Sequence, residues 1–223
     1  MRVTIVIPSY NQSKFLREAI ESALEQTVEC EVIVVDDGST DDSLKVAREY
    51  EPRIKVISQV NKGLASARNT GIMNAKGTHI LPLDADDILV ENCVEILTLA
   101  AEASDADVVA PSFRCFGEAE ENIILMATPQ LEDFRTGNRI GYFSLFKKPI
   151  LLEVGGYSPR MEEGYEDMHL TINLLTRGKR IVTVPQVLVL YRTKKESMWK
   201  ASLKHHKKLM NQIYHDFPEF LPI

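Results

Sequence analysis

The chain opens with VTIVIPSYN at residues 3–11, an apolar and β-branched run that turns polar after Pro8. This pattern is typical of a buried strand followed at once by a loop. Three further strands are predicted on the same grounds over residues 31–35, 54–57 and 79–83. Amphipathic helical patterns separate these runs, so strand and helix alternate through the first half of the chain. Such alternation predicts a mostly parallel sheet with helices on both faces.

The second half of the chain is less regular, and its elements are predicted from shorter runs. They are a helix over residues 94–103, strands over 108–110 and 123–127, a polar loop over 128–138, a helix over 166–177, two strands split by Pro185, and a basic final helix. The sequence shows no internal repeat and no low-complexity linker, which favours a single domain.

The composition narrows the class of protein. A chain of 223 residues with 44% hydrophobic residues is long enough to bury one sizeable core. Its formal net charge of -6 argues against a general affinity for nucleic-acid phosphates. Three widely spaced cysteines without a CxxC pair favour a reducing compartment, so we expect a cytoplasmic protein. The first apolar run is too short for the hydrophobic region of a signal peptide. No apolar run in the sequence reaches the roughly 20 residues that a membrane-spanning helix needs.

Polar residues follow three of the predicted strands. Pro8-Ser9-Tyr10 comes after the first, Asp36-Asp37-Gly38 after the second, and Asp84-Ala85-Asp86-Asp87 after the fourth. In open α/β sheets, ligands bind beyond the carboxyl ends of the strands. We therefore expect these three stretches to meet at one edge of the sheet and to form the functional site.

The acidic stretch is a candidate metal site. Crowded carboxylates favour a cation, and Mg²⁺ is often held by only one or two protein carboxylates together with substrate phosphates. The alternative is structural, since Asp86 or Asp87 could cap a helix that begins near Val90.

Two other acidic pairs also allow two interpretations. Asp36-Asp37 belongs to a turn that leads into a helix, or one of its carboxylates accepts hydrogen bonds from a base or ribose. Glu166-Asp167 begins a predicted helix, where both charges would complement the helix dipole. The alternative is that one of them is a general base that removes a proton from a hydroxyl.

Six motifs, taken together and in this order, resemble the family-2 inverting glycosyltransferases of the GT-A fold. They are residues 3–11 (VTIVIPSYN), 34–39 (VVDDGS), 61–64 (NKGL) with 67–71 (ARNTG), 83–87 (LDADD), 155–157 (GGY) and 165–167 (YED). The resemblance covers nearly all of the chain from Val3 to about Arg192.

The resemblance implies a role for individual positions of this sequence. It assigns donor binding to Pro8, Ser9, Tyr10, Asp37, Lys62, Arg68 and Asp84. Within that set it implies that Asp37 binds the base. It implies that Asp86 binds Mn²⁺ or Mg²⁺, with Asp87 as a neighbouring alternative. Asp167 would be the catalytic base.

The implied reaction moves a sugar from a nucleoside-diphosphate sugar, with a UDP-sugar favoured, to an acceptor hydroxyl with inversion. The acceptor would be a saccharide or a lipid-linked molecule in cell-surface polysaccharide or glycolipid assembly. Residues 1–110 would form the nucleotide-sugar-binding half, 111–195 the acceptor-side half of the same domain, and 196–223 a basic C-terminal helix. No oligomeric state is predicted.

The chain departs from the family pattern after Tyr191-Arg192-Thr193. Many relatives place a histidine shortly after this point, whereas this sequence has Lys194. A protonated lysine cannot ligate a metal, but it can neutralise phosphate charge. The departure therefore concerns the ligand set of the metal rather than the reaction.

Two other classes of function stay open. The first is a nucleotide-sugar-binding module without turnover, and the second is a phosphoacceptor signalling domain of the flavodoxin-like type, suggested by paired aspartates at strand ends. The long second half does not suit the signalling domain. The lack of a Gly-x-Gly-x-x-Gly turn argues against a dinucleotide-dependent dehydrogenase, and the lack of a Gly-Lys-Ser/Thr signature argues against a P-loop kinase.

Basic residues gather in the last stretch of the chain. They are Lys194, Lys195, Lys200, Lys204, Lys207 and Lys208, with His205 and His206 beside them. With Met198, Trp199, Leu203 and Leu209 as apolar neighbours, this stretch would rest on anionic lipid at the inner face of the membrane. The alternative is a solvated helix whose apolar residues pack on the domain.

Overall fold

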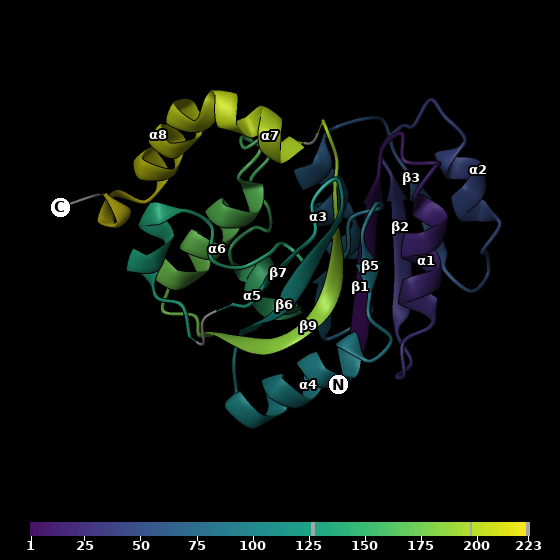
Figure 1. Cartoon of the computed structure of the whole chain (residues 1–223), viewed down its shortest axis with the longest axis horizontal. Coiled ribbons are helices and arrows are strands. Elements are labelled where there is room, and N and C mark those ends of the chain that lie inside the picture. Colours follow the sequence, from purple (N-terminus) through teal and green to yellow (C-terminus); the bar gives the residue numbers. More distant parts are fainter. Residues whose placement is uncertain (126–127, 197, 222–223) are drawn as a thin grey trace.

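The computed structural model describes residues 1–125, 128–196 and 198–221, with the side chain of Trp199 outside that description (Figure 1). The strands are β1 Val3–Ser9, β2 Glu31–Asp36, β3 Lys55–Ser58, β4 His79–Pro82, β5 Ile88–Leu89, β6 Val108–Gly117, β7 Glu121–Ile123, β8 Leu145–Lys147 and β9 Ile181–Thr193. The α-helices are α1 Leu16–Leu24, α2 Ser43–Arg48, α3 Leu64–Asn74, α4 Cys93–Ser104, α5 Lys148–Glu153, α6 Glu166–Thr176, α7 Met198–Ser202 and α8 His206–Asp216. Short 3₁₀ helices are η1 Leu131–Thr136, η2 Leu203–His205 and η3 Pro218–Phe220.

The strands form one mixed sheet in the order β3-β2-β1-β4-β8-β6-β9-β5, with β7 paired to β6. Strands β3, β2, β1 and β4 are parallel, and β6 is parallel to β9. Strand β8 runs antiparallel to both β4 and β6, and β5 runs antiparallel to β9. The predicted α/β fold with a mixed, mostly parallel sheet is therefore confirmed.

The side chains of the sheet pack into two hydrophobic cores, one on each face, because successive residues of a strand point to opposite faces. Ile5 and Ile7 pack with α1, α2 and α4, whereas Val6 between them packs with α3, α5, α6 and α8. Figure 1 shows this arrangement, with α1 and α2 on one side of the sheet and α5, α6 and α8 on the other. The helices thus lie on the two faces of the sheet, and the carboxyl ends of its first strands lie together at one edge.

The prediction of two strands split by Pro185 is wrong, because β9 continues through this residue. Its pairing with β6 passes from Pro111 with Val184 to Ser112 with Val187, so Pro185 lies in a bulge. A bulge accommodates a proline because the extra residue donates no ladder hydrogen bond.

The structure also changes the predicted middle of the chain. Strand β7 ends at Ile123, and residues 126–127 of the predicted strand over 123–127 lie outside the described residues. The predicted loop over 128–138 contains η1, which begins with a capping box at Gln130 and Asp133. Polar residues that cap their own backbone explain why this segment has the composition of a loop.

The structural alternative for the acidic stretch is wrong, because neither Asp86 nor Asp87 caps a helix. Residues Ile88–Leu89 form β5 on the sheet, and α4 begins only at Cys93 after Asn92.

No helix among the described residues is long and apolar enough to cross a bilayer.

Candidate active site

The three predicted stretches meet at one edge of the sheet, as expected. Ser9 at the end of β1 is paired in register with Asp36 at the end of β2, and Asp84 follows β4 on the other side of β1. Ser9 is buried with Pro8, whereas the side chain of Tyr10 is 46% exposed. Ser9 Oγ and Asp36 Oδ1 are buried without a hydrogen-bond partner among the described residues. The edge therefore holds polar groups that protein contacts leave unsatisfied.

Asp37 fixes the loop that precedes α3. Its Oδ1 accepts hydrogen bonds from Gln59 Nε2 at 2.7 Å and from the Lys62 amide at 3.0 Å, and its Oδ2 accepts one from the Gly63 amide at 2.8 Å. The carboxylate is buried, while the Lys62 side chain is exposed. Asp37 thus shapes the edge of the site, and its contact with a nucleotide base stays a prediction.

Arg68 on α3 joins the acidic stretch to the start of α6. Its guanidinium donates to Asp84 Oδ1 at 2.7 Å and to Glu166 Oε1 at 2.6 Å. The side chain is only 1% exposed and lies between the rings of Tyr142 and Tyr157, at 4.7 and 5.1 Å from their centroids. A planar guanidinium suits this position because it can pair with two carboxylates and stack on two aromatic faces together.

The position of Tyr157 follows from Gly156 and Asn69. Asn69 exchanges two hydrogen bonds of 2.8 Å with the backbone of Tyr157. Gly156 has φ +72°, and a Cβ on it would lie 2.3 Å from Asn69 Oδ1, so only glycine fits there. Two of the sequence motifs therefore interlock and press the Tyr157 ring against Arg68.

Each carboxylate of the acidic stretch has its own protein partner. Asp84 is paired with Arg68, and Asp86 is ion-paired through Oδ2 with Lys194 Nζ. Asp87 accepts a hydrogen bond from the Tyr142 hydroxyl and another, of 2.7 Å, from the amide of Arg192. Among the described residues, no group of three or more His, Cys, Asp or Glu side chains is gathered to hold a metal.

The electrostatic environments of these three carboxylates differ. Burial raises the pKa of Asp84 to about 6, although the adjacent Arg68 guanidinium lowers it. Burial, reinforced by the charges of Asp86 and Asp84, raises the pKa of Asp87 well above its usual range. Asp86 differs from them in that its partner is the half-buried ammonium of Lys194, at the end of a long side chain. One carboxylate with phosphate oxygens is a sufficient ligand set for Mg²⁺, so the residues present fit a divalent ion at Asp86.

The end of β9 covers this acidic stretch. Arg192 Nε donates to the backbone carbonyl of Asp86 at 2.8 Å, and its guanidinium lies over the rings of Phe15 and Phe116 at 4.7 and 4.4 Å. Its NH2 also forms a 2.6 Å ion pair with Glu18 of α1. Arg192 thus holds the backbone that presents Asp86.

Asp167 lies in the first turn of α6 and is half-buried. Its Oδ2 accepts a hydrogen bond of 2.8 Å from Asn138 Nδ2, and its Oδ1 accepts one of 2.7 Å from the amide of Met168. Burial, together with the charge of Glu166, raises the pKa of Asp167, and Arg68 lowers it in part. A carboxylate with a raised pKa beside a polar edge is suited to general-base chemistry.

Sequence reasoning missed several residues of this site. Tyr142 and Asn138 lie in a segment without a periodic pattern, so nothing local marks them. Tyr142 connects two positions of the acidic stretch, because its hydroxyl donates to Asp87 and accepts from the amide of Asp84 at 3.2 Å.

Comparison with known proteins gives matches over most of the chain. The model of the family "Glycosyl transferase family 2" matches residues 4–165. The glycosyltransferase GlyG of Streptococcus pneumoniae is 32% identical, with 89% of this chain and 73% of that protein covered. A chondroitin synthase of Escherichia coli is 47% identical over 98 residues, which are 42% of this chain and 14% of that protein.

Two solved structures share the architecture. Staphylococcus aureus TarS 1-349 in complex with UDP-GlcNAc superposes with a TM-score of 0.83 at 19% identity, covering 96% of this chain and 65% of that one. A mannosyltransferase from Pyrobaculum calidifontis in complex with GDP-Man and Mn²⁺ gives a TM-score of 0.72 at 21% identity, covering 94% and 64%. The chain therefore spans slightly less than two thirds of these solved structures.

Proposed function

This chain belongs to glycosyl transferase family 2 and has the GT-A fold, and on that premise we propose that it transfers a sugar with inversion from a nucleoside-diphosphate sugar to an acceptor hydroxyl. A UDP-sugar is the favoured donor. The observation that carries the proposal is the bridge made by Arg68, which binds Asp84 of the acidic stretch and Glu166 beside Asp167. This bridge supports the proposal because Asp84 would contact the donor and Asp167, next to Glu166, would be the base.

In the proposed reaction, Asp167 accepts the proton of the acceptor hydroxyl. The acceptor oxygen forms a bond to the anomeric carbon from the face opposite the leaving group. The bond between that carbon and the phosphate oxygen breaks, and its electron pair leaves with the nucleoside diphosphate. A single displacement of this kind inverts the anomeric configuration. Ser9, Tyr10, Asp37 and Lys62 would border the nucleotide, since they lie along the same edge.

We propose that Asp86 binds the metal and that Asp87 is not a ligand but helps to fix the backbone that carries Asp86. Both oxygens of Asp87 are engaged by Tyr142 and Arg192, whereas the ion pair of Asp86 with Lys194 uses only Oδ2. Bound Mn²⁺ or Mg²⁺ would supply Lewis-acid neutralisation of the departing diphosphate. Lys194 would turn from Asp86 towards a phosphate oxygen, where its positive charge would also neutralise the departing diphosphate.

Asp86→Asn is expected to remove the part of UDP binding that depends on Mn²⁺. In wild type, saturating UDP with Mn²⁺ should raise the melting temperature by about 5 °C more than UDP alone. The matched control is Asp105→Asn, which changes the same functional group at an exposed position after α4. The control should keep the Mn²⁺-dependent rise, and an undiminished rise in Asp86→Asn would contradict the proposal.

The proposed acceptor is a saccharide or a lipid-linked molecule in polysaccharide or glycolipid assembly. The name of the chondroitin synthase relative supports a polysaccharide product. If the chain bound UDP-sugars tightly and released no UDP with any acceptor, it would instead be a nucleotide-sugar-binding module.

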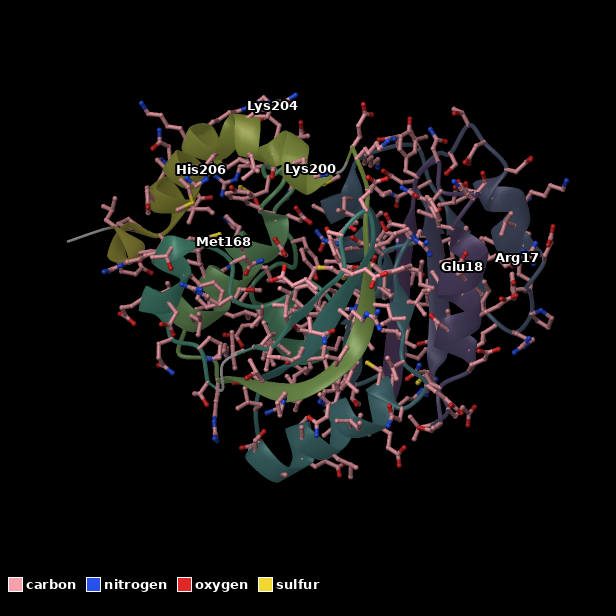
Figure 2. The ribbon with its side chains drawn as sticks, in the orientation of Figure 1. Arg17, Glu18, Met168, Lys200, Lys204 and His206 are labelled. Atoms are coloured by element: carbon pink, nitrogen blue, oxygen red, sulfur yellow. The ribbon has the colours of Figure 1, made fainter. Side chains whose placement is uncertain are left out.

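We also propose a peripheral contact with the inner face of the membrane through the C-terminal helices. Lys204, His205, Lys207 and Lys208 are exposed there, and Figure 2 shows Lys200 and Lys204 along this edge of the molecule. Met198 and Leu203 are 50% and 48% exposed beside them, whereas Leu209 packs into the core. Exposed apolar side chains among lysines are typical of a surface that rests on anionic lipid.

Reversing two of these charges should weaken binding to vesicles that contain phosphatidylserine. Lys204→Glu with Lys207→Glu is expected to lower vesicle binding in a sedimentation assay at least about tenfold, since each basic residue near the surface contributes about 1 kcal/mol. The control is Lys45→Glu with Arg48→Glu on α2, an equal change of charge on the far side of the sheet (Figure 1). Equal binding by both double variants would refute the contact.

A further inference from the structure

The C-terminal helices touch the turn that carries Asp167. Tyr165, directly before α6, has its hydroxyl 2.9 Å from Nδ1 of His206, the first residue of α8. The two rings meet edge to face, with their centroids 5.8 Å apart. Figure 2 labels His206 and Met168, which lie on the same side of the molecule, where α8 runs beside α6. Helix α8 therefore contacts a residue two positions from the proposed base.

The backbone of Tyr165 needs such support. It has φ 63° and ψ 15°, a left-handed conformation that is unfavourable for a bulky residue. Conformations of this kind persist only where surrounding contacts hold them, and they gather at functional sites. The Tyr165 carbonyl accepts the hydrogen bond of the His169 amide at 2.8 Å. This bond begins the ladder of α6, so the conformation of Tyr165 sets the direction in which the Asp167 side chain leaves the helix.

The residues on either side of Tyr165 are held as well. Gly164 has φ +121° and lies against Ser202, so closely that a Cβ on it would be 2.6 Å from Ser202 Cβ. Glu163 Oε2 forms an ion pair of 2.8 Å with Lys208 Nζ. After Tyr165, Glu166 is fixed by Arg68 from inside the domain. The turn is thus held between the core and the C-terminal helices: the Tyr165 hydroxyl contacts His206 before Asp167, and His169 Nε2 lies 3.0 Å from Asp216 Oδ2 of α8 after it.

We propose that His206 is a positioning residue for Asp167 and acts through its hydrogen bond to the Tyr165 hydroxyl. This inference rests on the proposed role of Asp167 as the base. His206 touches neither donor nor acceptor in this proposal. It keeps Tyr165 in the left-handed conformation, and α6 then presents the Asp167 carboxylate to the acceptor hydroxyl. Loss of the contact should lower the rate of the chemical step without weakening donor binding.

The kinetic test uses release of UDP to water from whichever of UDP-glucose, UDP-galactose and UDP-GlcNAc the wild type hydrolyses fastest. His206→Ala is expected to lower kcat about threefold to tenfold, the range for one lost hydrogen bond, with the KM for the donor unchanged. His206→Asn should restore most of the rate, because its amide reaches the place of Nδ1. Tyr165→Phe should match His206→Ala, and the double variant should lose no more than either single one. The control is Asn211→Ala, at an exposed position on the same helix.

The structural test measures hydrogen exchange of the His169 amide by NMR. His206→Ala and Tyr165→Phe should speed this exchange at least threefold, whereas His206→Asn and Asn211→Ala should leave it unchanged. Unchanged exchange in His206→Ala, or faster exchange with an unchanged kcat, would overturn the inference. This measurement needs no nucleotide sugar. If the wild type hydrolysed none of the three donors, the proposed function would be in question, and the exchange rates would still decide whether His206 holds the turn.

Discussion

Asp167→Asn is expected to lower UDP release and sugar transfer by about 10²- to 10⁴-fold while UDP binding stays as in wild type. The carbamoyl group keeps the shape of the carboxylate and can still contact Asn138, but it cannot accept the proton of the acceptor hydroxyl. The measurement pairs the initial rate of UDP release with UDP affinity by calorimetry. Asp105→Asn, the same chemical change far from the edge of the site, should keep the wild-type rate.

The pH dependence of the wild type gives a second test of the same base. Burial and the neighbouring Glu166 raise the pKa of Asp167 to about 7. Because the base works only when it is deprotonated, kcat/KM should rise as the pH increases and level off above about 7. Asp167→Asn should lose this rising limb. A wild-type rate in Asp167→Asn, or an unchanged limb, would exclude Asp167 as the base.

Arg68→Met is expected to lower the free energy of unfolding by about 3–5 kcal/mol. The substitution keeps much of the apolar volume but leaves the carboxylates of Glu166 and Asp84 without their partner, in a setting where Arg68 itself is 1% exposed. Urea unfolding measures the change. Because the lost stability reflects uncompensated buried charge, adding Glu166→Gln to Arg68→Met should recover part of it.

The control for this prediction is a surface pair of equal length. Arg17 forms a 2.6 Å ion pair with Glu49, and both side chains are about half exposed (Figure 2). Arg17→Met should therefore cost at most about 1 kcal/mol. If Arg68→Met cost no more than Arg17→Met, the buried bridge would contribute nothing beyond a surface ion pair.

The regular half of the fold was predictable because its signals are local. The strands β1 to β4 lie within one or two residues of the predicted runs, since each is an apolar stretch bounded by polar residues. The path of β9 could not be predicted, because a proline usually ends a ladder and only the pairing with β6 shows the bulge. The 3₁₀ helix η1 was missed because its polar residues resemble those of a loop. In the structure, Gln130 and Asp133 bind each other's backbone as a capping box.

The site was predictable in place but not in its contacts. The acidic stretch was expected at the edge of the sheet because it follows a strand, whereas Asp167 was predicted only at the start of a helix, with its role as a base implied by the resemblance. Their partners come from distant parts of the chain, as Tyr142, Lys194 and Asn138 show. Whether a carboxylate in such a cluster binds a cation or a neighbouring ammonium depends on these tertiary contacts, which no local pattern records.

The strand order of the sheet has a consequence for the newly made chain. Strand β8 lies between β4 and β6, although it is the last of the three to be synthesised. When residues 1–117 have left the ribosome, β4 and β6 have both been made. The backbone edge of each strand that pairs with β8 in the folded sheet is then still without its partner. Unpaired strand edges of this kind make nascent chains prone to aggregate with one another. The two parts of the sheet are thus joined only after β8, a strand of three residues, has been made, and β9 then completes the pairing of β6 and β5.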